Sequence, residues 1–108
     1  MKDDLQDLDK LIEFIADNFK FNEQKYPQLK GVSKEEVLTF AIKHSALHFA
    51  KTAGKIAAVS ENVDHGGELD IKELKENVSK SLINTLRLAD LAGISDTELL
   101  KTIKEMIK

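Results

Sequence analysis

Hydrophobic positions near the start of the chain follow helical spacing. They step by three and four residues between 3 and 19: Leu5, Leu8, Leu11, Ile12, Ile15 and Phe19. Steps of this size place the side chains on one stripe of an α-helix. The pattern ends at Tyr26-Pro27, because proline restricts the residue before it to extended backbone. We therefore predict a helix over 3–19 and a loop over 20–32. We expect three apolar residues of this loop to pack against the rest of the protein: Phe21, Tyr26 and Leu29.

Three capping boxes mark the starts of further helices. Ser33, Asp70 and Ser95 are each followed by glutamate three residues later, so a side-chain oxygen caps the helix and the glutamate returns a bond. Gly93 is suited to a left-handed helix end. The expected helices are 34–60, 71–92 and 96–107. Four helices with short connections predict an all-α fold, a four-helix bundle built on a central antiparallel hairpin, in one domain over residues 1–108.

The helix expected over 34–60 is apolar nearly all round. Its predicted core stripe is Leu38, Ile42, Phe49 and Ile56. The stripe expected on the next helix is Ile71, Leu74, Val78, Leu82, Leu86 and Ala89. A helix that is apolar on opposite sides is normally buried on both. We therefore expect self-association, most simply as a closed two-fold dimer.

Each central helix also carries a line of basic and amide side chains. On the first the line is His44, His48, Lys51 and Lys55; on the second it is Asn77, Lys80, Asn84 and Arg87. Because a short loop makes the helices an antiparallel hairpin, we expect the two lines to face one cleft. Neither line contains a carboxylate, so the cleft suits an anion such as a phosphate ester. In the alternative interpretation both lines are solvated, or are neutralised by nearby acids: Glu61, Asp64, Glu68 and Asp90.

Composition excludes several classes of protein. The chain has 108 residues, a net charge of −3 and no cysteine. The net charge argues against a globally basic nucleic-acid binder. The lack of cysteine excludes disulfides and thiolate chemistry, and it favours a reducing, cytoplasmic location. No apolar run approaches the roughly 18 to 20 residues of a membrane span, so we expect no membrane partner.

Metal and catalytic motifs are weak. His44 and His48 have the spacing of helical metal ligands, and His65 follows in the next loop. The neighbouring lysines would repel a metal ion, and a carboxylate or thiolate ligand is missing from both lines. We therefore predict no metal and no cofactor, and we assign no catalytic residue.

Two segments carry a resemblance to a known family. The Tyr-Pro-Gln-Leu-Lys-Gly run at 26–31 precedes the long capped helix, and Leu-Arg-Leu-Ala-Asp-Leu-Ala-Gly-Ile at 86–94 ends the next one. This order resembles the all-α nucleoside triphosphate pyrophosphatases, the MazG-like family, over about Ser33–Ile103. The resemblance implies a MazG-like helical fold and a nucleotide as the ligand.

The metal-binding residues of that family are replaced here. In the family, three glutamates on the first central helix and a Glu-x-x-Asp on the second hold magnesium. By position they fall on Lys51, Thr52, Lys55, Asn77 and Lys80. Magnesium prefers carboxylate oxygens, so metal-dependent hydrolysis is not expected.

We therefore predict a non-catalytic protein that binds a nucleotide or other phosphorylated small molecule, with lysines where the family has metal. One alternative is a structural or protein-interaction module that has lost the ligand. Another is a nucleotide pyrophosphohydrolase-like enzyme with altered, metal-independent chemistry, in which His44 or His48 acts as acid or base.

Overall fold

The computed structural model describes the backbone of residues 2–107 and the side chains of residues 7–107, so the Leu5 side chain lies outside it. Across this part of the chain there are four α-helices, one 3-10 helix and no strand. They are α1 (Lys2–Asn18), η1 (Pro27–Leu29), α2 (Lys34–Asp64), α3 (Ile71–Leu91) and α4 (Asp96–Met106). The predicted all-α class is confirmed, and α2 extends beyond its expected end at residue 60.

The predicted capping residues begin their helices as expected. Ser33 Oγ accepts a hydrogen bond from the Glu36 amide at 3.2 Å, and Asp70 Oδ1 accepts one from the Glu73 amide at 3.0 Å. Ser95 caps α4 in the same way. After α3, Gly93 adopts a left-handed φ of 72°. These local signals fix where the helices start and stop.

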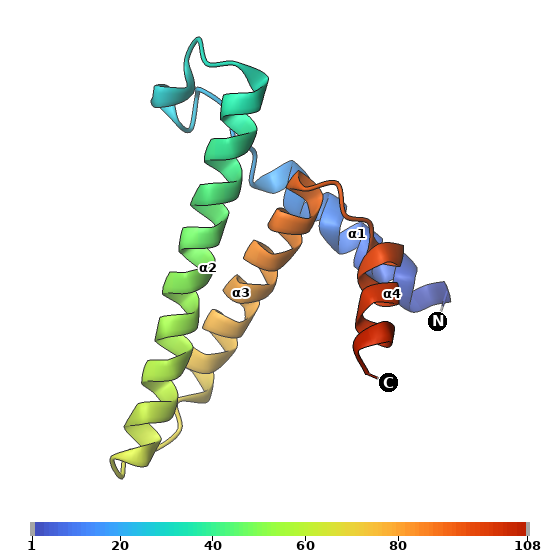
Figure 1. Cartoon of the computed structure of the whole chain (residues 1–108). Helices are drawn as coiled ribbons and strands as arrows, with labels where there is room; N and C mark the ends of the chain where they lie inside the picture. Colours follow the sequence, from blue (N-terminus) through green and yellow to red (C-terminus); the bar gives the residue numbers. More distant parts are fainter. Residues whose placement is uncertain (1, 108) are drawn as a thin grey trace.

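The two long helices form an antiparallel hairpin (Figure 1). The shorter α1 packs against the C-terminal half of α3, and α4 packs against α1. The end of the hairpin that carries the α2–α3 loop projects beyond both short helices (Figure 1). The radius of gyration is 16.6 Å, whereas about 13 Å is typical of a compact domain of this length. A single chain is therefore an open arrangement.

A small apolar core forms where α1 meets α3. Ile12, Ile15 and Leu86 are buried there, and partly buried side chains pack around them: Leu8, Ile83 and Leu99. The loop before α2 also packs down as predicted, with Leu29 buried and Tyr26 half-buried. No helix in the described part of the chain combines the length and apolar character that crossing a membrane requires.

The predicted core stripes of α2 and α3 are wrong over most of their length. Leu38, Ile42 and Phe49 are 37 to 42% exposed. On α3 only Leu86 and Ala89 of the predicted stripe are buried, while three other members are exposed: Ile71, Val78 and Leu82.

The residues buried instead are small or polar. On α2 they are Ala41, Ser45, Thr52 and Val59; on α3 they include Asn77 and Asn84. Small side chains let two helix backbones approach closely, so the larger apolar residues lie beside the contact. We call Ser45, Thr52, Asn77 and Asn84 the polar seam.

Candidate functional site

A cavity of about 390 Å³ opens along one edge of the α2–α3 hairpin. Seven of the eight predicted ligand-binding residues line it: His44, His48, Lys51, Lys55, Lys80, Asn84 and Arg87. Phe19, Tyr26, Thr52 and Ile83 complete its wall. The lining therefore holds four cationic side chains and two imidazoles, and none of its residues is a carboxylate. We call this cavity the basic groove.

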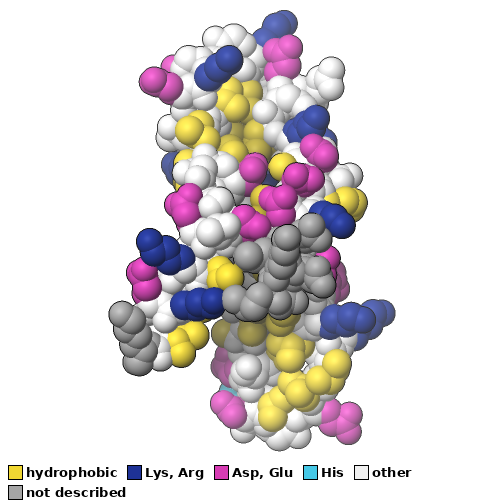
Figure 2. Space-filling view, turned by 90° about the vertical axis from the view of Figure 1, so that its right-hand side faces the viewer, with side chains coloured by type: hydrophobic (Ala, Val, Ile, Leu, Met, Phe, Trp, Pro, Cys, Tyr) yellow, Lys and Arg dark blue, Asp and Glu magenta, His cyan; other side chains and the backbone are white. Residues whose placement is uncertain are grey.

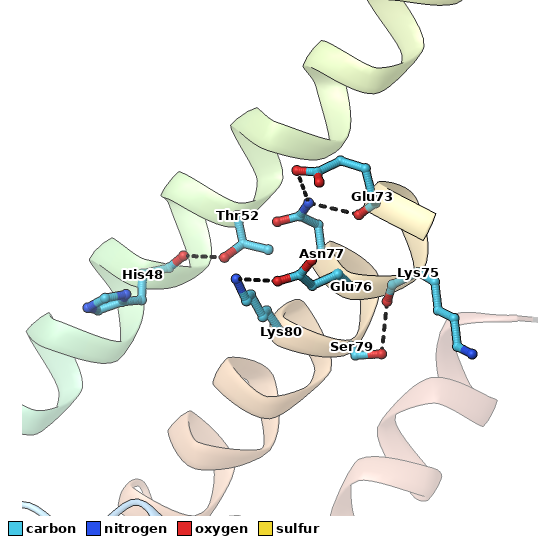
Figure 3. Close-up of polar contacts among 8 residues, drawn as sticks. All are labelled: His48, Thr52, Glu73, Lys75, Glu76, Asn77, Ser79 and Lys80. Atoms are coloured by element: carbon cyan, nitrogen blue, oxygen red, sulfur yellow. Dashed lines mark hydrogen bonds and ion pairs between the residues drawn. The ribbon is translucent and has the colours of Figure 1, made fainter. Parts of the chain in front are cut away.

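Asn77, the eighth predicted residue, lies between the helices and does not line the groove. It is 1% exposed, and its Nδ2 donates to the carbonyl oxygen of Glu73 at 2.9 Å and to Glu73 Oε1 at 3.1 Å. Figure 3 shows its side chain directed toward Thr52, whose Oγ1 donates to the His48 carbonyl at 2.8 Å. Two of the five positions aligned with family carboxylates, Thr52 and Asn77, thus belong to the polar seam.

The lysines of the groove differ in their partners. Lys80 Nζ lies 3.2 Å from Glu76 Oε1, and both side chains are about half exposed (Figure 3). Exposed pairs of this kind contribute about 0–1 kcal/mol and exchange easily. Lys51 and Lys55 form no ion pair with any carboxylate whose side chain the structure describes. The lysine end of the groove is therefore only partly neutralised within the chain.

The other end of the groove is aromatic. The Tyr26 and His44 rings lie 5.2 Å apart, and the Tyr26 hydroxyl is 3.4 Å from His44 Nε2. Phe40 stacks on His44 at 5.5 Å and also lies 5.3 Å from the Tyr26 ring, so the three rings contact one another. Tyr26 reaches this position because Pro27 starts η1 and turns the chain onto α2. The resulting wall holds His44 beside His48, with ring centroids 4.4 Å apart.

The surroundings of His44 disfavour its charged form. Partial burial lowers its pKa below the ordinary value of 6.5, and the nearby His48 and Arg87 lower it further. A phosphate in the groove would act in the opposite sense, because a nearby anion favours the imidazolium. An anion in the groove would therefore oppose the lowering of the His44 pKa.

Arg87 connects the groove to the N-terminal part of the chain. Its guanidinium carbon lies 4.3 Å from the centre of the Phe21 ring, and Nη2 donates to the Phe19 carbonyl oxygen at 3.2 Å. Burial lowers its pKa, but an arginine stays charged in proteins. Its Nε is buried without a partner among the described residues. Arg87 thus adds positive charge to the wall of the groove, and its contacts with Phe19 and Phe21 hold the guanidinium in place.

Four groove residues were not predicted as ligand-binding residues: Phe19, Tyr26, Thr52 and Ile83. Phe19 was assigned to a core stripe from its spacing alone. Its contact with Arg87 joins positions 68 residues apart, and no local pattern reveals such a contact.

The alternative metal site at His44 and His48 finds no third ligand among the described residues. No group of three or more His, Asp or Glu side chains in that part of the chain is arranged to hold a metal ion. His65 follows the C-terminal end of α2 and is not among the groove residues.

Comparison with protein-family models, with curated proteins and with solved structures finds no match to this chain. The resemblance to the MazG-like family therefore rests on the sequence segments described above and stays a prediction.

Proposed function

We propose that this protein binds a phosphorylated small molecule, a nucleotide in particular, in the basic groove without a metal ion. The observation that supports this most is the lining of the groove, in which four cationic side chains converge on a cavity of about 390 Å³ with no carboxylate among the lining residues. Cavities of roughly 300–1,000 Å³ hold small ligands. Charge-assisted hydrogen bonds from lysine to phosphate are among the stronger polar contacts in proteins.

The chemistry of the groove fits the two parts of such a ligand. Lys51 and Lys55 supply positive charge at one end, and Lys80 joins them by exchanging Glu76 for a phosphate oxygen. Tyr26 and His44 at the other end offer ring surfaces for a base or sugar. The Nδ2 of Asn84 donates to the Lys80 carbonyl at 3.0 Å, which leaves its side-chain oxygen for a ligand donor.

The proposed function is binding rather than metal-dependent hydrolysis. At the five positions where the resemblance places metal-binding carboxylates, this chain has lysine, threonine or asparagine. We expect no pyrophosphate release from the common nucleoside triphosphates with added magnesium or manganese. Turnover that a chelator abolishes would contradict the metal-free proposal. Turnover that persists in chelator would favour the enzyme alternative, with His44 or His48 as acid or base.

A thermal-shift screen in chelator tests binding directly. Ligands that bind only the folded state raise the unfolding midpoint by mass action. We expect at least one of pyrophosphate, nucleoside monophosphates and nucleoside triphosphates to raise it, and the corresponding unphosphorylated nucleosides to have a much smaller effect. If none of these phosphates raises the midpoint at millimolar concentration, the proposal fails.

The second candidate is a protein-interaction module, and exposed apolar residues favour it. Leu47 on α2 and Val78 on α3 are 62% and 51% exposed. Self-association, which the apolar character of α2 on opposite sides predicts, belongs to this candidate and is compatible with the first. A negative ligand screen combined with a stable oligomer would favour the interaction module.

A further inference from the structure

The edge of the hairpin opposite the basic groove is mainly apolar over its central part, with Lys75 of α3 at its margin. An α-helix advances about 100° per residue, so on α2 Lys51 and Lys55 fall on one side of the seam residue Thr52. Ile42, Phe49 and Ile56 fall on the other side, seven residues apart. On α3 the same edge carries Leu74 and Val78. We call these five residues, with the alanines beside them on α2, the apolar edge.

The apolar edge is open to solvent in a single chain. Phe49 is 39% exposed and Val78 is 51% exposed. The alanines next to the large residues are exposed as well: Ala46, Ala50, Ala53 and Ala57. Figure 2 shows hydrophobic side chains at the surface of the projecting end of the hairpin, which holds only the part of the apolar edge nearest the α2–α3 loop. Neither α1 nor α4 extends to that end (Figure 1).

The exposed area is larger than a monomer of this mass normally has. The accessible surface is 8139 Å² for a chain of 12.1 kDa, whereas the size relation for folded monomers gives about 6,000 Å². The excess is about 2,000 Å². Obligate homodimers bury about 2,000–5,000 Å² in total, which is about 1,000–2,500 Å² per chain. The excess is therefore the area that one side of a stable dimer interface needs.

We propose that the apolar edge binds the same edge of a second copy, so that two hairpins form an antiparallel four-helix bundle with a two-fold axis. A second copy fits because the edge is mainly apolar, so it offers little charge that would select a different protein, and because large and small apolar residues alternate along it. The large residues at seven-residue spacing can enter the gaps above the alanines of the partner, as in coiled coils. An isologous contact of this kind is closed and stops at two chains.

The dimer leaves both basic grooves accessible, because each groove lies on the edge of the hairpin that faces away from the interface. Association and ligand binding are thus separate properties of the same two helices. The dimer proposal does not depend on the proposed function and can hold or fail independently of it.

Light scattering during size-exclusion chromatography tests the proposal in wild type. At micromolar concentration we expect twice the chain mass of 12.1 kDa. A wild type that stays at the mass of one chain over this range would overturn the proposal.

Ala53→Glu tests the assigned face. Ala53 is exposed in the single chain, and glutamate is a good helix former, so the fold of one chain should tolerate the change. In the dimer the new charge would be buried without a partner, which should raise the dissociation constant by about a hundredfold or more. The matched control is Ala58→Glu, the same change on the same helix but away from the apolar edge. An Ala53→Glu protein that dimerises as tightly as Ala58→Glu would place the interface elsewhere.

Single-cysteine variants provide a second test, which does not require that Ala53→Glu folds. The natural chain has no cysteine, so each variant carries one thiol. Near a two-fold axis a residue meets its own copy, and we expect mild oxidation to link at least one of Ala46→Cys, Ala50→Cys, Ala53→Cys and Ala57→Cys into a covalent dimer. Ala58→Cys should link far more slowly. Equal linking of all five, or none, would contradict the assignment.

Discussion

The two edges of the α2–α3 hairpin differ in chemistry. One edge carries Lys51, Lys55 and Lys80, and the other carries Ile42, Phe49 and Val78. The first edge lines a cavity with four cations and no lining carboxylate. The second presents apolar side chains to solvent. Between the two edges the helices touch through the small and polar side chains of the seam.

The difference shows that one pair of helices can carry two surfaces of opposite chemistry. Charge draws a small anion into a concave site, and its strength depends on salt. An apolar surface binds a partner that excludes water from it, and the strength of that association depends on the apolar area that is covered. The seam keeps the two surfaces apart, because it uses neither the lysines nor the large apolar residues to join α2 to α3.

A substitution on one edge should weaken nucleotide binding alone, and a substitution on the other should weaken the dimer alone. Lys55→Glu reverses a charge inside the groove, and losing one charge-assisted contact already costs about 1.5–3 kcal/mol. We expect calorimetric titration in chelator, with the nucleotide found by the screen, to show at least a tenfold loss of affinity. Ala53→Glu should bind the same nucleotide normally while losing the dimer.

Lys104→Glu is the control for that charge reversal. Lys104 lies on α4, away from the basic groove, and its reversal should leave affinity nearly unchanged. If Lys55→Glu and Lys104→Glu bind equally well, the lysine line is a solvated helix face, and the interaction module becomes the better description of the protein.

Salt should affect nucleotide binding at the basic groove much more than dimerisation at the apolar edge. Screening shortens the reach of exposed charges from about 10 Å at 0.1 M to about 3 Å at 1 M ionic strength. Nucleotide affinity should therefore fall several-fold between those conditions, while the dimer mass measured by light scattering stays constant. Dimer dissociation in parallel with ligand loss would mean that charge, and not apolar area, holds the two chains together.

The seam offers a smaller effect on stability. Ser45 is fully buried, and its hydroxyl oxygen has no hydrogen-bond partner among the described residues. Because an unsatisfied buried polar group costs about 1–3 kcal/mol, Ser45→Ala should raise the unfolding free energy by about 1 kcal/mol and the midpoint by about 5 °C. Ser60→Ala, on an exposed part of α2, is the control and should change the midpoint much less. A lower midpoint for Ser45→Ala would show that the hydroxyl has a partner in solution.

The smallest expected effect is the pH dependence due to His44. Its pKa in the folded protein lies below 6.5, so between these two values the unfolded chain binds more protons than the folded one. The unfolding free energy therefore decreases as pH falls through 6.5 toward the folded-state pKa. His44→Asn should remove part of the decrease in midpoint between about pH 7.5 and pH 5.5, as followed by circular dichroism. His65→Asn, outside the groove, should leave that decrease intact.

Features set by neighbouring residues were predictable from the sequence. Ser33, Asp70 and Ser95 cap helices through bonds to amides three residues away, and Gly93 ends α3 through its own backbone freedom. Such signals need no knowledge of the rest of the fold. The spacing of His44, His48 and the lysines of α2 likewise sets a line on one side of a helix, and the structure brings this line together with Lys80, Asn84 and Arg87.

The buried faces of the hairpin were not predictable in the same way. Hydrophobicity favoured Ile42 and Phe49 as core residues, but α3 packs against Ser45 and Thr52. Which side of a helix is buried depends on the element that meets it, and the apolar side of α2 stays exposed in a single chain. Asn77 was placed in the cleft because it shares a line with Lys80, yet it lies far enough around the helix to enter the seam.

The bond from Arg87 to the Phe19 carbonyl also bears on the order of folding. The hairpin closes across a loop of a few residues between α2 and α3, whereas the Arg87–Phe19 bond closes 68 residues of chain. The entropy of closing the longer loop disfavours early contact by about 2 kcal/mol relative to the shorter one. The hairpin should therefore form first and α1 should dock later. Since Phe19 and Arg87 both line the groove, the groove is complete only after that last step. Amide hydrogens of α1 should therefore exchange with solvent sooner than those of the hairpin.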